Sequence, residues 1–91
     1  EFYVSNNYPN PFNPVTSFYI DVPDAGNLFV AVYDVNGRLV NELINTQVVA
    51  GRVQGRWSGK SELGTMSPTG IYFLKVETGT NYHVQKLALV K

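Results

Sequence analysis

The clearest strand signal in the chain is the stretch TSFYIDV, residues 16–22. Its apolar residues Phe18, Ile20 and Val22 occupy every second position, which is typical of a β-strand with one face buried. Pro23 follows and ends the strand, because proline cannot donate to a ladder of backbone hydrogen bonds. The same period of two recurs along most of the chain.

Further strands are expected between turn signals. Residues 28–33 are apolar on both faces, which indicates a central strand. Asn36 and Gly37 form a strong hairpin signal, since both tolerate positive φ, and branched residues favour a strand over a helical turn in 38–44. The remaining expected strands are 53–58, 71–77 and 82–90, separated by a polar loop over 59–70 and a turn over 78–81. Six or seven short strands predict an all-β fold, a single antiparallel β-sandwich over residues 1–91.

A proline-rich segment precedes the first long strand, and we name residues 8–14 the lead-in segment. It consists of Tyr8, Pro9, Asn10, Pro11, Phe12, Asn13 and Pro14. Each proline fixes its own φ and pushes the preceding residue toward extended geometry, which excludes helix. Tyr8 and Phe12 are expected to pin this stiff segment onto an apolar surface.

Composition limits the class of protein. The length of 91 residues fits one domain. Seven basic and seven acidic side chains cancel without clustering, so no nucleic-acid partner is expected. The chain has no cysteine, which excludes disulfides and thiolate metal sites. No apolar run reaches the ~20 residues that cross a bilayer, so no membrane insertion is expected.

No persuasive catalytic site is present in the sequence. The single histidine, His83, falls on an expected strand without a positioned nucleophile or acid partner. Neither a zinc or calcium spacing nor a phosphate-binding loop appears, so we expect no enzymatic activity and no cofactor. Adventitious calcium binding by Asp21 and Asp24 stays open.

Two aromatic residues have alternative roles. Trp57 is either a core residue or a platform for a sugar ring, and the core is favoured. Tyr72 follows Gly70 at the head of a late strand, a position similar to the tyrosine corner of immunoglobulin-like domains; the alternative is an ordinary core tyrosine. The core residues expected to share one cluster are Phe18, Ile20, Leu28, Val30, Val32, Trp57, Tyr72 and Leu74.

Several motifs together resemble one family over nearly the whole chain. They are NNYPNPFNPVTSFYIDVPDAG (6–26), VYDVNGRLVNEL (32–43), AGR (50–52), WSG (57–59), PTGIYFLKV (68–76) and QKLALVK (85–91). These motifs are similar to those of the C-terminal sorting domain of the type IX secretion system and of the related module of flagellar hook-capping proteins. The resemblance implies an immunoglobulin-like sandwich of about seven strands. Ser58 stands where the family has Asp, so no acidic role is carried over, and Gly55 replaces a branched residue, which should weaken its strand.

The resemblance implies a non-catalytic sorting domain at the C-terminus of a larger secreted protein. Such a domain is recognised by outer-membrane secretion machinery and directs its parent, via the periplasm, to the surface of a Gram-negative bacterium or to the medium. One alternative is an accessory binding or spacer module that contacts surface polysaccharide or the parent catalytic domain through Tyr19, Phe29 or Tyr82. Another is a structural domain of a hook-cap-like protein.

The final expected strand is the candidate receptor contact. An edge strand offers unpaired N–H and C=O groups to a partner strand. The candidate partner-binding residues are Lys86, Leu87, Leu89 and Lys91. The alternative is that the two lysines only protect the edge against aggregation.

Overall fold

The computed structural model describes residues 1–90, which form seven β-strands. They are β1 (Tyr3–Val4), β2 (Thr16–Val22), β3 (Gly26–Asp34), β4 (Leu39–Val48), β5 (Gly51–Trp57), β6 (Gly70–Glu77) and β7 (Tyr82–Leu89). Within these 90 residues there is no helix, and hence none long and apolar enough to cross a membrane.

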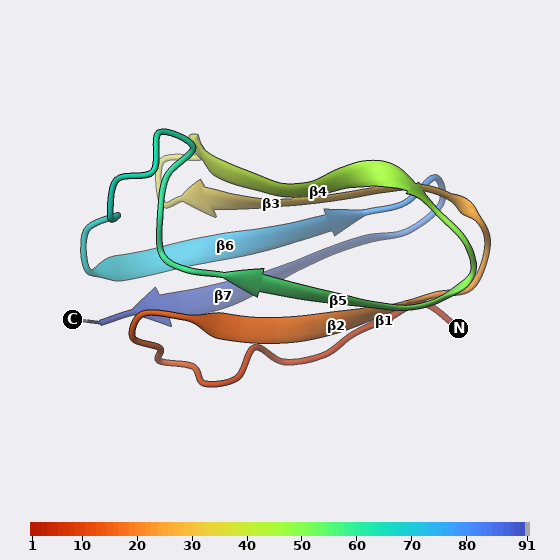
Figure 1. The fold of residues 1–91 in the computed structure, drawn as a ribbon, viewed down its shortest axis with the longest axis horizontal. Helices are drawn as coiled ribbons and strands as arrows, with labels where there is room; N and C mark the ends of the chain where they lie inside the picture. The colour runs from red at the N-terminus through yellow and green to blue at the C-terminus, as the bar shows by residue number, and fades with distance from the viewer. Residues whose placement is uncertain (91) are drawn as a thin grey trace.

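Two antiparallel sheets pack face to face (Figure 1). One has the strand order β1-β2-β5, and the other has the order β4-β3-β6-β7. The predicted immunoglobulin-like sandwich of about seven antiparallel strands is therefore confirmed. β3 lies between β4 and β6, as its two apolar faces indicate.

The Asn36-Gly37 turn connects β3 to β4. Gly37 adopts a φ of 81°, which favours glycine, and its N–H donates to the Asp34 carbonyl at 3.0 Å. The Asp34 side chain accepts the backbone N–H of Asn36 at 2.9 Å and that of Arg38 at 3.0 Å. β4 then continues to Val48, four residues beyond the expected end at residue 44.

All eight predicted core residues are buried in one cluster between the sheets. Trp57 is 1% exposed, its ring centroid lies 5.1 Å from that of Tyr72, and its Nε1 donates to the Lys60 carbonyl at 2.9 Å. Trp57 is therefore a core residue and not a surface platform. The Tyr72 hydroxyl donates to the Pro68 carbonyl at 2.5 Å, the upstream bond expected of a tyrosine corner. Burial raises the pKa of Tyr72.

Gly55 does not interrupt the pairing of its strand, and the expected weakening of that strand stays a prediction. β5 pairs with β2 in regular register, and Phe18 lies opposite Gly55. A Cβ on Gly55 would lie 2.4 Å from Cζ of Phe18. The phenyl ring thus occupies the space that a side chain at position 55 would fill.

Candidate functional site

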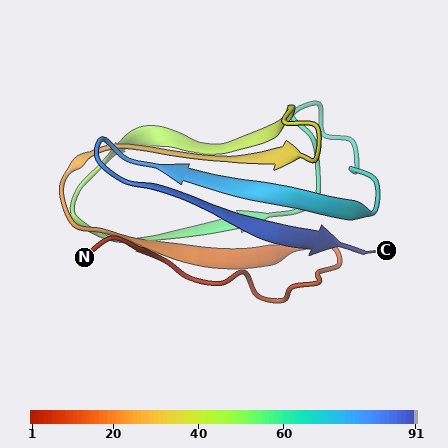
Figure 2. The same ribbon diagram turned by 180° about the vertical axis from the view of Figure 1, so that it is seen from behind.

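The sandwich has two flanks, at each of which an edge of one sheet faces an edge of the other. We name the flank between β1-β2 and β7 the closed flank, and the flank between β4 and β5 the open flank. The lead-in segment runs along β2 toward the end of β7 and closes the first of these (Figures 1 and 2).

Backbone hydrogen bonds attach the lead-in segment to both sheets. Tyr8 and Ser17 exchange two bonds, of 2.9 and 3.0 Å, on the β2 side. Phe12 donates to the Ala88 carbonyl at 2.9 Å and accepts from Val90 N–H at 3.0 Å, beside β7. The segment therefore joins the two sheets at the closed flank.

Asn10 covers the next part of the β7 edge with its side-chain amide. Its Nδ2 donates to the Lys86 carbonyl at 3.2 Å, and its Oδ1 accepts from Ala88 N–H at 2.9 Å. An amide side chain carries both a donor and an acceptor, so it replaces a strand residue between prolines that cannot donate. The expectation that the final strand has a free edge is wrong over Lys86–Val90.

The two aromatic residues of the lead-in segment behave differently. Phe12 is 1% exposed and its ring centroid lies 5.5 Å from that of Trp57, so it anchors the segment in the core. Tyr8 is 81% exposed, and the prediction that its ring pins the segment is wrong. Thr16, which is fully buried, donates to the Pro9 carbonyl at 2.7 Å and holds the segment from the other side.

The candidate partner-binding residues lie in unlike places. Leu87 and Leu89 are buried in the core, so their side chains are not available to a partner in the folded domain. Lys86 is exposed. Lys91 lies outside the described residues. Only Lys86 therefore offers an exposed side chain from this set within residues 1–90.

A polar cluster that the sequence did not indicate lies farther along β7. Gln85 Nε2 donates to the Ser5 carbonyl at 3.0 Å and also contacts Asn7 Oδ1. His83 Nε2 lies 2.8 Å from Gln85 Oε1. Gln85 and Asn10 both bridge segments about 80 residues apart in sequence, and isolated amides give no periodic signal that would reveal such contacts.

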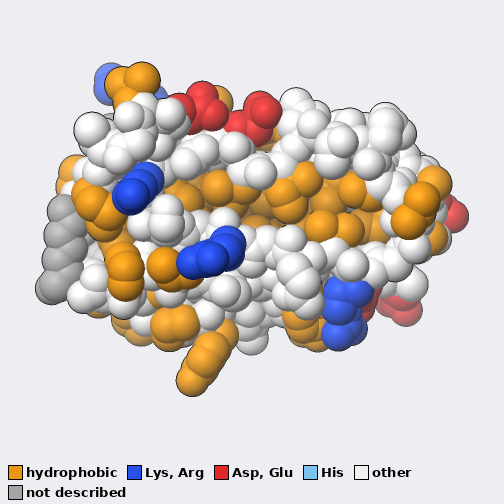
Figure 3. All heavy atoms as spheres, in the orientation of Figure 1, with side chains coloured by type: hydrophobic (Ala, Val, Ile, Leu, Met, Phe, Trp, Pro, Cys, Tyr) orange, Lys and Arg blue, Asp and Glu red, His pale blue; other side chains and the backbone are white. Residues whose placement is uncertain are grey.

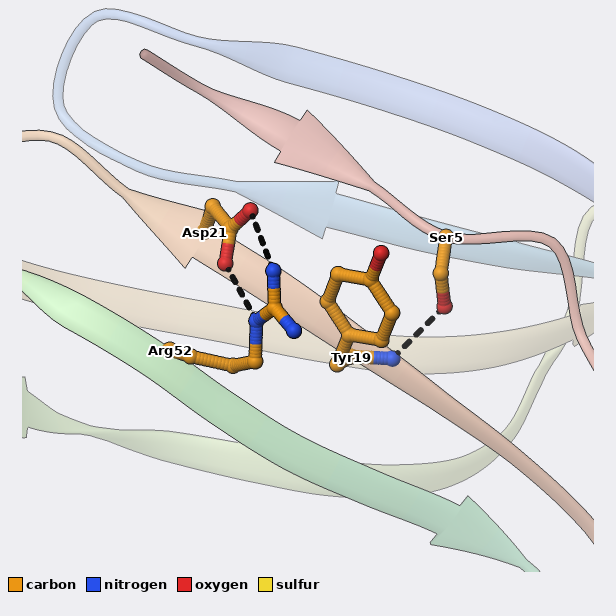
Figure 4. Close-up of polar contacts among 4 residues, drawn as sticks. All are labelled: Ser5, Tyr19, Asp21 and Arg52. Atoms are coloured by element: carbon orange, nitrogen blue, oxygen red, sulfur yellow. Dashed lines mark hydrogen bonds and ion pairs between the residues drawn. The ribbon is translucent and has the colours of Figure 1, made fainter.

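An ion pair connects β2 and β5 on the outer face of the smaller sheet (Figure 4). Arg52 donates to both carboxylate oxygens of Asp21, at 2.8 and 3.2 Å, and holds the pKa of Asp21 below its usual value. Its guanidinium also lies 3.8 Å from the Tyr19 ring centroid. The Asp21 carboxylate is thus engaged by arginine, and one face of the Tyr19 ring is covered.

The aromatic residues considered for carbohydrate binding do not share one surface. Tyr19 lies on β2, whereas Phe29 and Tyr82 lie on β3 and β7 of the other sheet. Glu77 of β6 lies between these two, because it pairs with Phe29 on one side and with Tyr82 on the other. Among residues 1–90, no group of three or more His, Asp or Glu side chains could hold a metal ion.

Comparison with known proteins identifies the family of the chain. Residues 13–81 match the model of the FlgD Ig-like domain. The chain belongs to the FlgD Ig-like domain family. A structure of FlgD from P. aeruginosa shares 32% identity with this chain at a TM-score of 0.62, covering 81% of this chain and 57% of that one. No curated protein matches the chain in sequence.

Two proteins of Porphyromonas gingivalis share the fold over 99% of this chain. Dimeric latent PorU has a TM-score of 0.72 at 21% identity. PorZ, a surface component of the type IX secretion system, has a TM-score of 0.61 at 22% identity. The FlgD-family chain spans only 9% and 11% of these two proteins.

Proposed function

We propose that this domain is a non-catalytic C-terminal sorting domain that directs a parent protein across the outer membrane to the cell surface or the medium of a Gram-negative bacterium. The observation that carries the proposal is the docking of the lead-in segment onto β7. This docking joins a segment near the start of the domain to its last strand in one folded unit. A tag that acts by being bound needs a stable surface and no catalytic groups.

The extent of the fold likeness supports sorting over a hook-cap role. The fold likeness to FlgD covers 81% of this chain, and the sequence match to the FlgD Ig-like domain spans residues 13–81, which omits residues 8–12 and β7. The fold likeness to PorU and PorZ covers 99% of the chain and so includes both docked segments. PorZ itself is described as a component of the type IX secretion system.

The polar groups of the described chain support a non-catalytic role. His83 bonds to a glutamine amide, and Asp21 is paired with Arg52. Neither arrangement activates a nucleophile or positions a general acid against a base. We therefore expect the isolated domain to show no turnover of peptide, ester or glycan substrates.

A reporter fusion tests the sorting function. Residues 1–91 are fused to the C-terminus of a periplasmic reporter in a host with the type IX machinery, and the reporter is measured at the surface, in the medium and in the periplasm. Export of the reporter is the expected result. An intact, folded fusion that stays periplasmic would overturn the proposal.

The receptor contact is tested separately on Lys86. Lys86→Glu reverses an exposed charge on β7 and leaves the core unchanged, so reduced export with unchanged thermal stability is expected. Lys60→Glu is the matched control, because Lys60 is also exposed but lies in the loop after β5. Equal export of both variants would exclude Lys86 from the receptor contact and leave the sorting function standing.

A structural role in a hook-cap protein is the second candidate, and the 32% identity with FlgD favours it. Its direct test is replacement of the corresponding domain of P. aeruginosa FlgD by residues 1–91, with flagellar assembly as the measurement. Assembly in that strain, together with a periplasmic reporter fusion, would replace the sorting proposal by this one.

A further inference from the structure

The two sheets have four edge strands, and three of them carry protection against further pairing. β1 has only two residues, and the lead-in segment covers the end of β7. Register shifts interrupt the pairing of β4 with β3, and Glu62 covers part of the outer edge of β4: its N–H donates to Val40 and its carboxylate accepts from Glu42 N–H. Short strands, bulges and covering loops are usual protections of sheet edges. β5 has none of these, since its seven residues pair with β2 in regular register and include no proline. Within the described chain, its edge is protected only by the charges of Arg52 and Arg56, which an acidic partner would neutralise.

The free edge of β5 presents the backbone groups of every second residue. Ser17 exchanges both of its hydrogen bonds with Tyr8, on the side of β2 away from β5. Successive residues of a strand turn their backbone groups to opposite sides, so Phe18 faces β5 and pairs with Gly55. Gly55 and Val53 therefore turn their N–H and C=O groups toward β2, and the residues that alternate with them turn these groups outward. Within residues 1–90, no backbone group pairs with the outward groups. These outward residues are Arg52, Gln54 and Arg56.

A groove of about 370 Å³ runs beside this edge. It is lined by Ser17, Leu43, Ile44, Gln54, Gly55 and Arg56. Figure 3 shows hydrophobic side chains along the hollow between β4 and β5, with acidic side chains on the β4 side and basic side chains on the β5 side. Gly55 lies at this groove, and the Phe18 ring fills the space beside it on the inner side of β5.

We propose that the edge of β5 is a docking site for an extended segment of a partner protein, which adds to the β1-β2-β5 sheet as a fourth strand. Such strand addition uses main-chain hydrogen bonds for affinity and alternate side chains for specificity. The closed flank supplies an internal precedent, because there the lead-in segment of the chain itself hydrogen-bonds to a sheet edge and inserts Phe12.

The walls of the groove specify the chemistry of the partner segment. The inward-pointing side chains of the partner segment would contact Leu43 and Ile44, which are partly buried apolar residues of the groove. These partner side chains are therefore expected to be apolar. Side chains that point outward lie beside Arg56, which has no ion-pair partner among the described residues, whereas Arg52 is already paired with Asp21. The partner segment therefore alternates apolar and acidic residues, and this site stands whether or not the domain is an export signal.

A designed peptide tests the site on the 91-residue chain. The probe is a capped peptide of about seven residues, matching β5 in length, in which glutamate alternates with valine and phenylalanine. We expect saturable binding, and amide hydrogen exchange measured by NMR should slow by about tenfold or more at Arg52, Gln54 and Arg56. Absence of binding by the wild-type chain would overturn the proposal.

Gln54→Pro removes one outward N–H that the fold itself does not use, since proline is tolerated on an edge strand when its nitrogen faces solvent. We expect a loss of peptide affinity of about tenfold or more. Gln54→Thr keeps the N–H and is the matched control, with near wild-type binding. Equal binding by Gln54→Pro and Gln54→Thr would overturn strand addition.

Charge reversal keeps the proposal testable if the proline variant fails to fold. Arg56→Glu should lose affinity for the glutamate peptide and gain affinity for the same peptide with lysine in place of glutamate, while the wild-type chain shows the opposite preference. Unchanged preference would overturn the role of Arg56. If the chain instead dimerises in sedimentation without peptide, and Gln54→Pro abolishes the dimer, the occupant is a second copy and the partner-segment proposal is wrong.

Discussion

On the closed flank the edge of β7 is covered by residues of the chain itself, whereas on the open flank the edge of β5 faces a groove. Both flanks join edges of different sheets in the same sandwich. The difference is that the closed flank has a nearby proline-rich segment that carries an amide, Asn10, and an aromatic ring, Phe12, in positions that reach β7 and the core. Closure of a sandwich thus depends on such a specific segment and does not follow from the strands alone.

Phe12→Ala should have the largest effect, because it removes the ring that anchors the closed flank. Phe12 is almost fully buried beside Trp57, so we expect a loss of about 3–5 kcal/mol in the free energy of unfolding. Chemical denaturation of both proteins gives the value. Tyr8→Ala is the matched control and should cost little, since its ring is exposed. A loss below about 1 kcal/mol for Phe12→Ala would show that the flank closes without its aromatic anchor.

Gly55→Val tests the packing at the open flank and should have the next largest effect. The new Cβ would overlap the Phe18 ring at 2.4 Å, and overpacking of this kind costs about 1–3 kcal/mol. Gly79→Ala is the control, because no atom lies within 4 Å of its added Cβ. Phe18→Leu combined with Gly55→Val should recover part of the loss in a double-mutant cycle. Additive losses would mean that the ring and position 55 do not share the same space.

These two sites also show what the sequence could and could not predict. Alternation of apolar residues and the Asn36-Gly37 turn gave the strands and the sandwich, because period and turn chemistry are local properties. The destination of the lead-in segment is not local, since Asn10 and Ala88 are 78 residues apart. Tyr8 and Phe12 are both aromatic, and which of them is buried depends on the path of a segment without a repeating pattern. The contact between Gly55 and the Phe18 ring likewise depends on the register in which β5 pairs with β2, and the amino-acid composition does not reveal that register.

Asn10→Ala should have a smaller effect, confined to the closed flank. It leaves Ala88 N–H and the Lys86 carbonyl without their side-chain partner at an exposed position, where water can replace it, so we expect a loss of about 1 kcal/mol. Amide hydrogen exchange should accelerate at Ala88 and remain unchanged on β5. Asn6→Ala is the control, because Asn6 is exposed. Equal acceleration on both flanks would show that the amide stabilises the whole domain and not the β7 edge.

The ion pair between Asp21 and Arg52, on the sheet that borders the open flank, should give the smallest effect. Hydrogen bonding to Arg52 lowers the pKa of Asp21 from its ordinary value of 3.8, so folding favours the ionised carboxylate. The stabilisation is therefore complete at neutral pH and is lost as the pH falls through the lowered pKa of the folded state. It should be small because both groups are exposed to solvent.

The variant Asp21→Asn tests this direction of the pH dependence. Urea denaturation gives the free energy of unfolding of the variant and of the wild-type chain. The wild-type chain should be slightly more stable at neutral pH, and the difference should vanish in acid, where the Asp21 carboxyl is protonated in both states. High salt at neutral pH should reduce the same difference, since exposed charges are screened. A difference that persists unchanged in acid would mean that Asp21 supports the β2-β5 pairing by packing or neutral hydrogen bonds, and the open-flank sheet would then not depend on this charge.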